Sequence, residues 1–266
     1  MLRPRISPCL LLHKGALVKT QGFATPKYVG DPINAVRIFN EKEVDEIIVL
    51  DIDSSVTGAE PDYSLIRRLA AECRMPLCYG GGVRTVEHFE RIIALGVEKV
   101  AVGAACISNP ELLTNAAQIV GSQSVVAVAD VRASKRPGEY RVFTHNATRD
   151  ANIGVAEFAK QMTSLGAGEI IVNSIDRDGY LQGYDLGLIQ VVRDAVQCPV
   201  TALGGAGSLK DIGELIAKFE IIGASAGSLF VFKGVYRAVL INYPNRADRD
   251  ALVQSALADR NGRVSK

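Results

Sequence analysis

The stretch Val125-Val126-Ala127-Val128-Ala129-Asp130 is a run of apolar residues that stops at a carboxylate. Five of its six residues have no polar side-chain atom, and three are β-branched valines, which is typical of a strand buried on both faces. Residues 131–135 after it are predicted to form a loop. Asp130 is therefore predicted to end a core strand. It is either a strand end that meets water or a catalytic group at the mouth of a barrel.

Eight short β-type runs occur along the chain, and most are followed by a segment with helical periodicity. The predicted strands are 6–12, 46–52, 77–80, 99–103, 125–131, 169–175, 200–204 and 221–226. The predicted helices are 62–74, 86–95, 110–120, 155–165, 188–195 and 210–219. Eight strand–helix units in about 240 residues favour the α/β class and a (βα)8 barrel, the TIM barrel. We predict one such barrel over residues 1–243 and a polar tail or short helix over residues 244–266.

An internal repeat supports a barrel made of two fused half-barrels. The pair Ile52-Asp53 recurs as Ile175-Asp176, 123 residues later, and Gly81 matches Gly204 at the same offset. A repeat that stays in register at two places predicts that the second and third units of each half correspond.

Composition and charge argue against several classes of function. Of the 266 residues, 48% are hydrophobic and 22% charged, and the formal net charge of +1 gives no basic field for nucleic acid. The apolar segment near the N-terminus is too short to cross a membrane. The cysteines form no CxxC pair, so we expect no metal or cofactor and predict reduced thiols in the cytoplasm. These cysteines are Cys9, Cys73, Cys78, Cys106 and Cys198.

Two glycine-rich loops occupy equivalent positions in the two halves, Gly81–Gly82 and Gly204–Gly205. Glycines there let a ligand approach the backbone closely, and a following helix N-terminus favours an anion. Each loop alone is equally well explained as a tight turn, but the symmetric pair favours two anion sites. Gly103–Ala104 would complete the first site and Gly227–Ser228 the second. A ligand with two phosphate-like ends, such as a phosphorylated compound or a nucleotide-sugar, would suit them.

Charged residues open four of the predicted strands: Arg5, Glu46, Lys99 and Glu169. Two cations and two anions at one end of a barrel could form a ring around its axis. Taken alone, the pattern is better explained as solvated strand ends, because exposed charges are common there.

Further polar residues are predicted on the same rim as Asp130. The rim candidates are Lys19, Asp51, Asp53, Asn173, Asp176 and Asp178, together with His13. A lone histidine after an apolar strand is more often a loop residue than a base. The first strand contributes only Pro8-Cys9-Leu10-Leu11-Leu12 opposite Asp130, and no residue there transfers a proton usefully at neutral pH.

The chain closely resembles the HisF family, the cyclase subunit of imidazole glycerol phosphate synthase, over about residues 1 to 240. The resemblance is carried by five segments: Gly15–Lys19 (within HKGALVK), Tyr79–Thr85 (YGGGVRT), Gly121–Asp130 (GSQSVVAVAD), Gly166–Asp185 (GAGEIIVNSIDRDGYLQGYD) and Ala202–Ser208 (ALGGAGS). It implies a barrel of half-barrel ancestry that binds a bis-phosphate substrate at the C-terminal rim. It also implies ammonia supply through the barrel axis from a docked glutaminase, HisH. Within the resemblance, Arg5, Glu46, Lys99 and Glu169 match the family's charged gate.

The chain departs from the family's pattern at two places. The family's cyclases use two aspartates as an acid/base pair, and Asp130 matches one of them while Leu11 occupies the position of the other. Loss of a general acid or base costs a factor of about 10²–10⁴ in rate. Gly103–Ala104 stands where the family usually has Asn-Thr side chains, which predicts weaker phosphate binding there.

Three further segments resemble the HisF-like proteins of surface-polysaccharide clusters, the WbuZ-type branch: Pro4–Phe23, Gly30–Asp53 and Gly223–Phe232. Such proteins accompany a HisH-like glutaminase and an ATP-dependent sugar amidotransferase in making acetamidino groups. The first hypothesis is therefore an ammonia-conducting subunit for sugar amidation. The second is an authentic cyclase of histidine biosynthesis, in which His13 or Asp176 assists Asp130. The third is a scaffold that binds the glutaminase without conducting anything.

Overall fold

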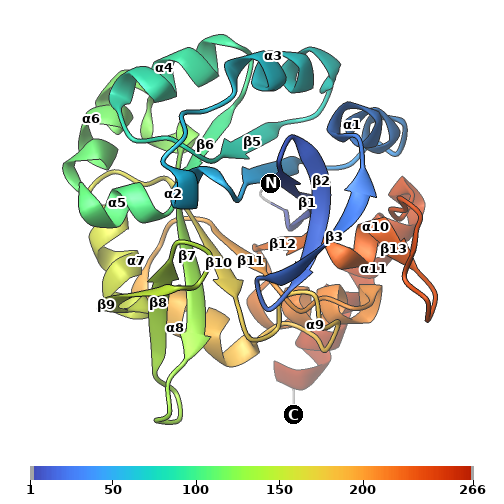
Figure 1. Cartoon of the computed structure of the whole chain (residues 1–266). Coiled ribbons are helices and arrows are strands. Elements are labelled where there is room, and N and C mark those ends of the chain that lie inside the picture. The colour runs from blue at the N-terminus through green and yellow to red at the C-terminus, as the bar shows by residue number, and fades with distance from the viewer. Residues whose placement is uncertain (1–2, 265–266) are drawn as a thin grey trace.

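The strands predicted from the apolar runs close into a parallel barrel, the predicted (βα)8 fold (Figure 1). The computed structural model describes residues 3–264. The barrel strands are β1 (Arg5–His13), β4 (Ile47–Asp51), β5 (Leu77–Gly80), β6 (Lys99–Val102), β7 (Val125–Ala133), β10 (Glu169–Ser174), β11 (Val200–Leu203) and β12 (Gly223–Ala226). Each pairs in parallel with the next, and the pairings of β7 with β10 and of β12 with β1 close the circle. The C-terminal ends of all eight strands therefore meet at one mouth.

Helices form the outer layer around the strands (Figure 1). The long ones are α1 (Pro32–Glu41), α3 (Tyr63–Glu72), α4 (Val86–Ala94), α6 (Glu111–Val120), α7 (Val155–Ser164), α8 (Leu186–Ala195) and α9 (Leu209–Phe219). Short helices follow three strands at the mouth, α2 (Ser54–Thr57), α5 (Ala104–Ser108) and α10 (Ser228–Val231), and a 3-10 turn, η1 (Ser122–Ser124), precedes β7. Helix α9 begins with a capping box, in which Ser208 and Asp211 each bond the other's backbone N–H, so the helix starts one residue before the predicted range 210–219.

Two hydrophobic clusters lie on the two sides of the barrel wall. The larger fills the space between strands and helices, and its Phe39, Phe89 and Phe158 are fully buried. The smaller fills the barrel interior with Cys9, Ile48, Cys78, Ala101, Val126, Val128, Ile171 and Leu203, and Leu11 and Leu50 pack against it. Residues alternate along each strand, so that Ile48 points inward between Ile47 and Val49.

Two β-hairpins that the sequence reading missed stand at the mouth: β2 (Ala16–Gln21) with β3 (Ala24–Gly30), and β8 (Tyr140–Thr144) with β9 (Arg149–Gly154). The predicted loop at 131–135 was wrong for its first three residues, which continue β7 and pair antiparallel with β8. Val131 and Val142 are buried at this pairing, and their burial explains why β7 extends beyond the barrel wall.

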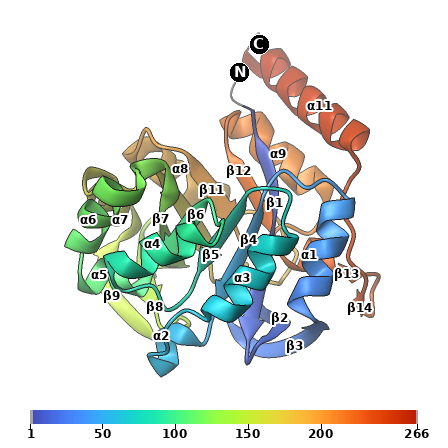
Figure 2. The ribbon, with the colours of Figure 1, turned by 90° about the horizontal axis from the view of Figure 1, so that it is seen from above.

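The C-terminal segment forms a small hairpin, β13 (Phe232–Lys233) with β14 (Ala238–Val239), and then the helix α11 (Arg246–Val264). Figure 2 shows α11 beside α9, at the end of the molecule where the N-terminus lies and away from the β2–β3 hairpin. The buried guanidinium of Arg249 lies with its Nε 3.7 Å from Asp45 Oδ1. Tyr243 donates its hydroxyl hydrogen to the carbonyl of Ile6 at 2.7 Å. These contacts tie the segment to the start of β1.

Within residues 3–264, every helix is too short or too polar to span a lipid bilayer.

Candidate active site

Four charged side chains form a ring at the N-terminal end of the barrel. Arg5 Nη2 lies 2.7 Å from Glu169 Oε1, and Arg5 Nε lies 3.5 Å from Glu46 Oε2. Lys99 Nζ lies 2.6 Å from Glu46 Oε1 and 2.8 Å from Glu169 Oε2. Both carboxylates are at most 5% exposed. The structure therefore brings the four residues together in alternating sign, and they are not solvated strand ends.

Lys99 and Glu169 keep their charged forms within this ring. Burial alone would lower the pKa of Lys99, but the carboxylates of Glu169 and Glu46 outweigh it and raise that pKa. Burial alone would raise the pKa of Glu169, but Lys99 and Arg5 outweigh it and lower that pKa. Thr201, which the sequence reading missed, adds a hydroxyl donor to Glu169 Oε1 at 2.5 Å. Lys99 and Glu169 therefore both favour their charged forms.

An apolar column separates this ring from the mouth. It consists of the interior cluster described above, in which Cys9, Cys78 and Ala101 are among the smallest side chains. Burial raises the pKa of the Cys9 thiol to about 11, so Cys9 stays neutral. Along the barrel axis, the charged ring at the N-terminal end is followed by the apolar interior and then by the polar mouth.

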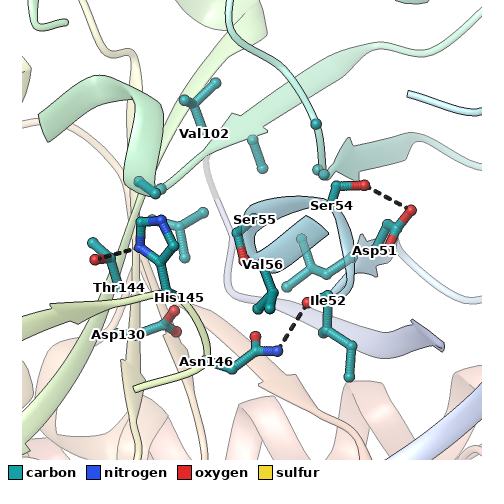
Figure 3. A pocket seen from close by; sticks show the side chains of 18 of the residues that line it. Asp51, Ile52, Ser54, Ser55, Val56, Val102, Asp130, Thr144, His145 and Asn146 are labelled. Atoms are coloured by element: carbon teal, nitrogen blue, oxygen red, sulfur yellow. Dashed lines mark hydrogen bonds between the residues drawn. The ribbon is translucent and has the colours of Figure 1, made fainter. Parts of the chain in front are cut away.

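A cavity of about 600 Å³ opens at the mouth. Its walls come from the C-terminal ends of β1, β4, β5, β6, β7, β10 and β11 and from several loops behind them. The strands β2 and β8 add Lys19, Thr20, Phe143 and Thr144. Figure 3 shows Asp130, Thr144 and His145 on one side of this pocket and Asp51 and Ser54 on the other.

Asp130 lies deep in this cavity. Burial raises the pKa of its carboxyl from the ordinary value of 3.8 to about 7. The hydrogen bond from Asn173 acts to lower this pKa, and the nearby charge of Asp178 acts to raise it. Asn173 Nδ2 donates to Asp130 Oδ1 at 3.2 Å. The amide oxygen of Asn173 has no hydrogen-bond partner among the residues described. A carboxyl that titrates near neutral pH in a cleft is suited to proton transfer.

Leu11 lines the same cavity and packs against the interior cluster beside Leu50. The cavity therefore has an apolar side chain, that of Leu11, on the β1 side of the mouth. Leucine can neither give nor take a proton.

Lys19 and Asp178 place opposite charges near Asp130. Lys19 is buried, and its Nζ donates to the carbonyl of Cys9 at 2.5 Å. Burial raises the pKa of Asp178, although Lys19, the hydroxyl of Thr20 and Arg237 act to lower it. Both side chains line the cavity.

The other rim carboxylates serve local structure. Asp51 lines the cavity but accepts hydrogen bonds from the Asp53 backbone N–H and from Ser54 Oγ, at 2.9 Å each. Asp53 lies 2.6 Å from His13 Nδ1. Asp176 accepts from the Ala133 backbone N–H at 2.9 Å.

His13, Asp53 and Asp176 do not belong to the described residues that line the cavity. Within residues 3–264, no three His, Cys, Asp or Glu side chains are arranged so that they could hold a metal ion.

The glycine loops divide into two groups. Gly81–Gly82 and Gly103–Ala104 line the cavity. Gly81 has φ +131°, and a Cβ there would lie 2.5 Å from that of Asp51, so the loop needs a glycine for close packing whether or not a ligand binds. Gly204–Gly205 and Gly227–Ser228 do not line the cavity formed by the described residues. Instead, Ser228 Oγ accepts from Arg237 Nη2 at 3.3 Å.

Five cavity residues come from the missed β8–β9 hairpin: Phe143, Thr144, His145, Asn146 and Arg149. Asn146 Nδ2 donates to the carbonyl of Ile52 at 2.9 Å and so ties the turn to the loop after β4 (Figure 3). The signal in the sequence is the group of aromatic and β-branched residues Tyr140, Val142, Phe143 and Thr144, which favours a strand.

Comparison with known proteins gives the family. The family described as "Histidine biosynthesis protein" matches residues 5–237. A Leptospira interrogans protein, named provisionally as imidazole glycerol phosphate synthase subunit HisF, is 52% identical over 252 residues, covering 95% of this chain and 99% of the relative. A Pseudomonas aeruginosa protein with a provisional name of the same kind is 51% identical over 245 residues, covering 92% and 97%.

The imidazole glycerol phosphate synthase subunit HisF of Lactococcus lactis subsp. cremoris is 40% identical over 230 residues, covering 86% of this chain and 89% of the relative. The chain therefore belongs to the histidine biosynthesis protein family and is a HisF-like synthase subunit.

Proposed function

We propose that this HisF-like subunit receives ammonia from a HisH-like glutaminase at the charged ring and releases it at the mouth for amidation of a sugar. The acceptor reaction is the formation of acetamidino groups in surface-polysaccharide or O-antigen synthesis, with an ATP-dependent sugar amidotransferase as the third component. One combination of features carries this proposal: the closed ring of Arg5, Glu46, Lys99 and Glu169 stands at one end, and Leu11 lines the same cavity as Asp130 at the other.

The barrel interior supports passage of ammonia as the neutral molecule. An ammonium ion loses several kcal/mol of hydration in apolar surroundings, whereas NH3 crosses them easily. The small, uncharged side chains of Cys9, Cys78 and Ala101 suit such a path. The glutaminase would dock at the ring, and the ring would admit NH3 there. The four charged side chains pair with one another, so the ring does not need a bound ion to balance its charge.

The mouth supports a task other than ring closure of a histidine precursor. That reaction uses a pair of proton-transferring groups, and loss of one costs a factor of about 10²–10⁴ in rate. Leu11 removes one member of the pair without affecting the ring or the interior column. Ammonia delivery needs only those two features.

A label-competition experiment tests the ammonia route. The protein is combined with its glutaminase and the sugar amidotransferase, given glutamine labelled with ¹⁵N in the amide, and exposed to a large excess of unlabelled ammonium. We expect the amidinated sugar to keep the ¹⁵N label with the wild type. Lys99→Phe should let the label be diluted by the ammonium while ammonium-driven amidation persists. Lys160→Met, on the outer helix α7, is the matched control and should behave like the wild type.

Dilution of the label with the wild-type protein would overturn the proposal and favour a scaffold. Unchanged labelling with Lys99→Phe, in a variant shown to be folded by circular dichroism, would remove the role of the ring.

A second candidate is the cyclase of histidine biosynthesis, and the state of Asp130 favours it. A buried carboxyl with a pKa of about 7 and an amide partner is poised for proton transfer. The cavity does not supply His13 or Asp176 as its helper. Turnover of the bis-phosphate substrate with ammonium separates the two candidates. On our proposal the wild type is inactive and Leu11→Asp gains about 10²-fold or more. A wild type that turns over rapidly, with no gain from Leu11→Asp, would establish the cyclase.

A further inference from the structure

Two hairpins leave the mouth ends of neighbouring barrel strands. The β2–β3 hairpin follows β1, and the β13–β14 hairpin follows β12 and α10, with β12 paired to β1. Lys19 and Thr20 of β2 line the mouth cavity, so the first hairpin borders it. Lys27 Nζ of β3 donates to the carbonyl of Arg237 at 2.8 Å, which joins the second hairpin to the first. Figure 2 shows the β13–β14 hairpin standing out from the side of the molecule next to α1. The two hairpins therefore form one surface that begins at the edge of the cavity.

The tip of the β13–β14 hairpin carries two apolar side chains that the fold does not use. The backbone N–H of Arg237 donates to the carbonyl of Gly234 at 3.0 Å, which closes a β-turn with Val235 and Tyr236 at its two central positions. Such positions usually hold Pro, Asn, Asp, Ser or Gly, because these residues favour the backbone of a turn. Val235 is 96% exposed and Tyr236 is 93% exposed. Neither the turn nor the core therefore explains these two side chains.

Further large apolar side chains are exposed on the same two segments. Ten such side chains are exposed among the described residues, and five of them lie on or next to the two hairpins: Tyr28, Val235, Tyr236, Val239 and Leu240. We call these five residues the hairpin patch. By contrast, the long outer helices contribute one exposed side chain of this kind from the described part of the chain, Ile119 of α6. Exposed apolar side chains that gather in one place mark an interaction surface.

The surroundings of the hairpin patch are cationic. Residues 14–30 and 221–247 contain six Lys and Arg residues and no Asp or Glu. Lys27, Lys233 and Arg237 lie on the hairpins, and no described carboxylate lies within 4.0 Å of their side-chain nitrogens. Lys27 and Arg237 instead contact a carbonyl, a hydroxyl and an aromatic ring. The patch is therefore complementary to a partner surface that exposes carboxylates.

Charge argues against a second copy and against a lipid surface as the occupant of the patch. A symmetric dimer through the patch would bring the same cations of two copies face to face. Recognition of anionic lipids typically uses a cluster of about four to eight Lys and Arg residues, and the hairpins carry fewer. A folded acidic partner needs only a pocket for the hairpin tip, because a few aromatic and Arg side chains carry most of the binding energy of a protein interface.

We infer that the hairpin patch is the docking surface for an acidic face of the ATP-dependent sugar amidotransferase, with Val235 and Tyr236 inserted into an apolar pocket of that face. This inference rests on the proposed function, since that function requires a third component at the mouth. A partner held by both hairpins lies beside the cavity that releases ammonia. Ammonia then reaches the partner before it mixes with the solvent.

Calorimetric binding of the purified sugar amidotransferase to the full chain tests this inference. We expect the wild type to bind more weakly at about 300 mM than at about 50 mM salt, because the charges are exposed. The double variant Val235→Ser/Tyr236→Ser should bind about tenfold or more weakly at both salt concentrations. Lys233→Glu should weaken binding mainly at the lower one.

Two variants on the outer helices are the matched controls. Ile119→Ser removes an exposed apolar side chain of α6, and Lys160→Glu reverses an exposed charge of α7. Both should bind the amidotransferase as the wild type does. All the substitutions are at exposed positions, and circular dichroism checks that each variant is folded.

Four results would overturn the inference. The first two are no binding by the wild type and equal affinities of the double variant and Ile119→Ser. The third is wild-type binding to phosphatidylglycerol vesicles, but not to the amidotransferase, that the double variant loses, which would assign the patch to a lipid surface. The fourth is dimerisation of the wild type that the double variant abolishes in sedimentation, which would assign the patch to a second copy.

The ¹⁵N competition experiment separates this inference from the ammonia route. If the wild type keeps the label and the double variant binds normally, the ammonia route stands and the docking surface is wrong. If the wild type loses the label and the double variant alone loses binding, the docking surface stands and the ammonia route is wrong.

Discussion

Replacing Asp130 by asparagine should stabilise the protein, and more at pH 8 than at pH 5. In the unfolded chain the carboxyl ionises with its ordinary pKa of 3.8, whereas burial in the folded protein raises that pKa to about 7. Between these values the unfolded state gains the free energy of ionisation and the folded state does not. The wild type therefore loses stability as pH rises from about 4 to about 7. Asparagine has nearly the same shape, does not ionise, and can keep the hydrogen bond from Asn173.

The size of the effect follows from the two pKa values. At 1.36 kcal/mol per pH unit, the full penalty above pH 7 is about 4 kcal/mol, of which about 1.5 kcal/mol is already present at pH 5. Urea unfolding of both proteins should therefore show the stabilisation by Asp130→Asn growing by about 2.5 kcal/mol between pH 5 and pH 8.

Asp150→Asn is the matched control for this measurement. The backbone N–H of Asn152 and the guanidinium of Arg141 lower the pKa of exposed Asp150, so it is ionised at both pH values in both states. Its substitution should change stability equally at pH 5 and pH 8. An equal effect of Asp130→Asn at the two pH values would refute the reasoning, because it would mean that the mouth hydrates Asp130 like a surface carboxylate.

Three further predictions concern the anchor, the column and the mouth. Arg249→Met should destabilise the fold by about 1–3 kcal/mol in urea unfolding, because it removes a buried guanidinium and leaves exposed Arg3 as the remaining cation beside partly buried Asp45. Exposed Arg246→Met is the control and should change stability by less than about 0.5 kcal/mol. Ala101→Leu should lower glutamine-driven but not ammonium-driven amidation by filling the column, at a cost of about 1–3 kcal/mol in stability. Gly103→Asn should fold as the wild type does in a thermal melt and bind phosphate more tightly by calorimetry, since its Cβ has space.

The barrel and the place of Asp130 at its mouth could be predicted because both follow from two properties of parallel sheets: strands buried on both faces, and strand ends that share one edge. Apolar runs such as Val125–Ala129 can be buried on both faces only in a parallel sheet covered by helices. The C-terminal ends of parallel strands meet at one edge, which brings Asp130, Asn173 and Asp178 together without further information. The charged ring follows the same rule at the opposite edge. Whether its members face one another or the solvent depends on strand tilt, which the sequence pattern does not report.

The second layer of the mouth could not be predicted from the same rules. Strand β7 continues past the barrel wall because Val131 pairs with Val142, eleven residues away across a loop that the sequence marks only by polar residues. The turn that follows needs left-handed backbone at His145, where the sequence offers no glycine to signal it. His145 is 15 residues from Asp130 in the chain, and only the hairpin brings it to the cavity.

Asp130 is costly to keep if the barrel only conducts ammonia. Its carboxyl removes about 4 kcal/mol of stability above pH 7, comparable to a large fraction of the net stability of a typical domain. Destabilising polar groups of this kind are found where a protein uses them. If Asp130→Asn stabilises the protein and leaves ¹⁵N transfer to the sugar unchanged, the carboxyl serves no step of delivery. If labelled transfer falls instead, Asp130 takes part in the chemistry at the mouth. The proton that its carboxyl carries near neutral pH would then be transferred during amidation.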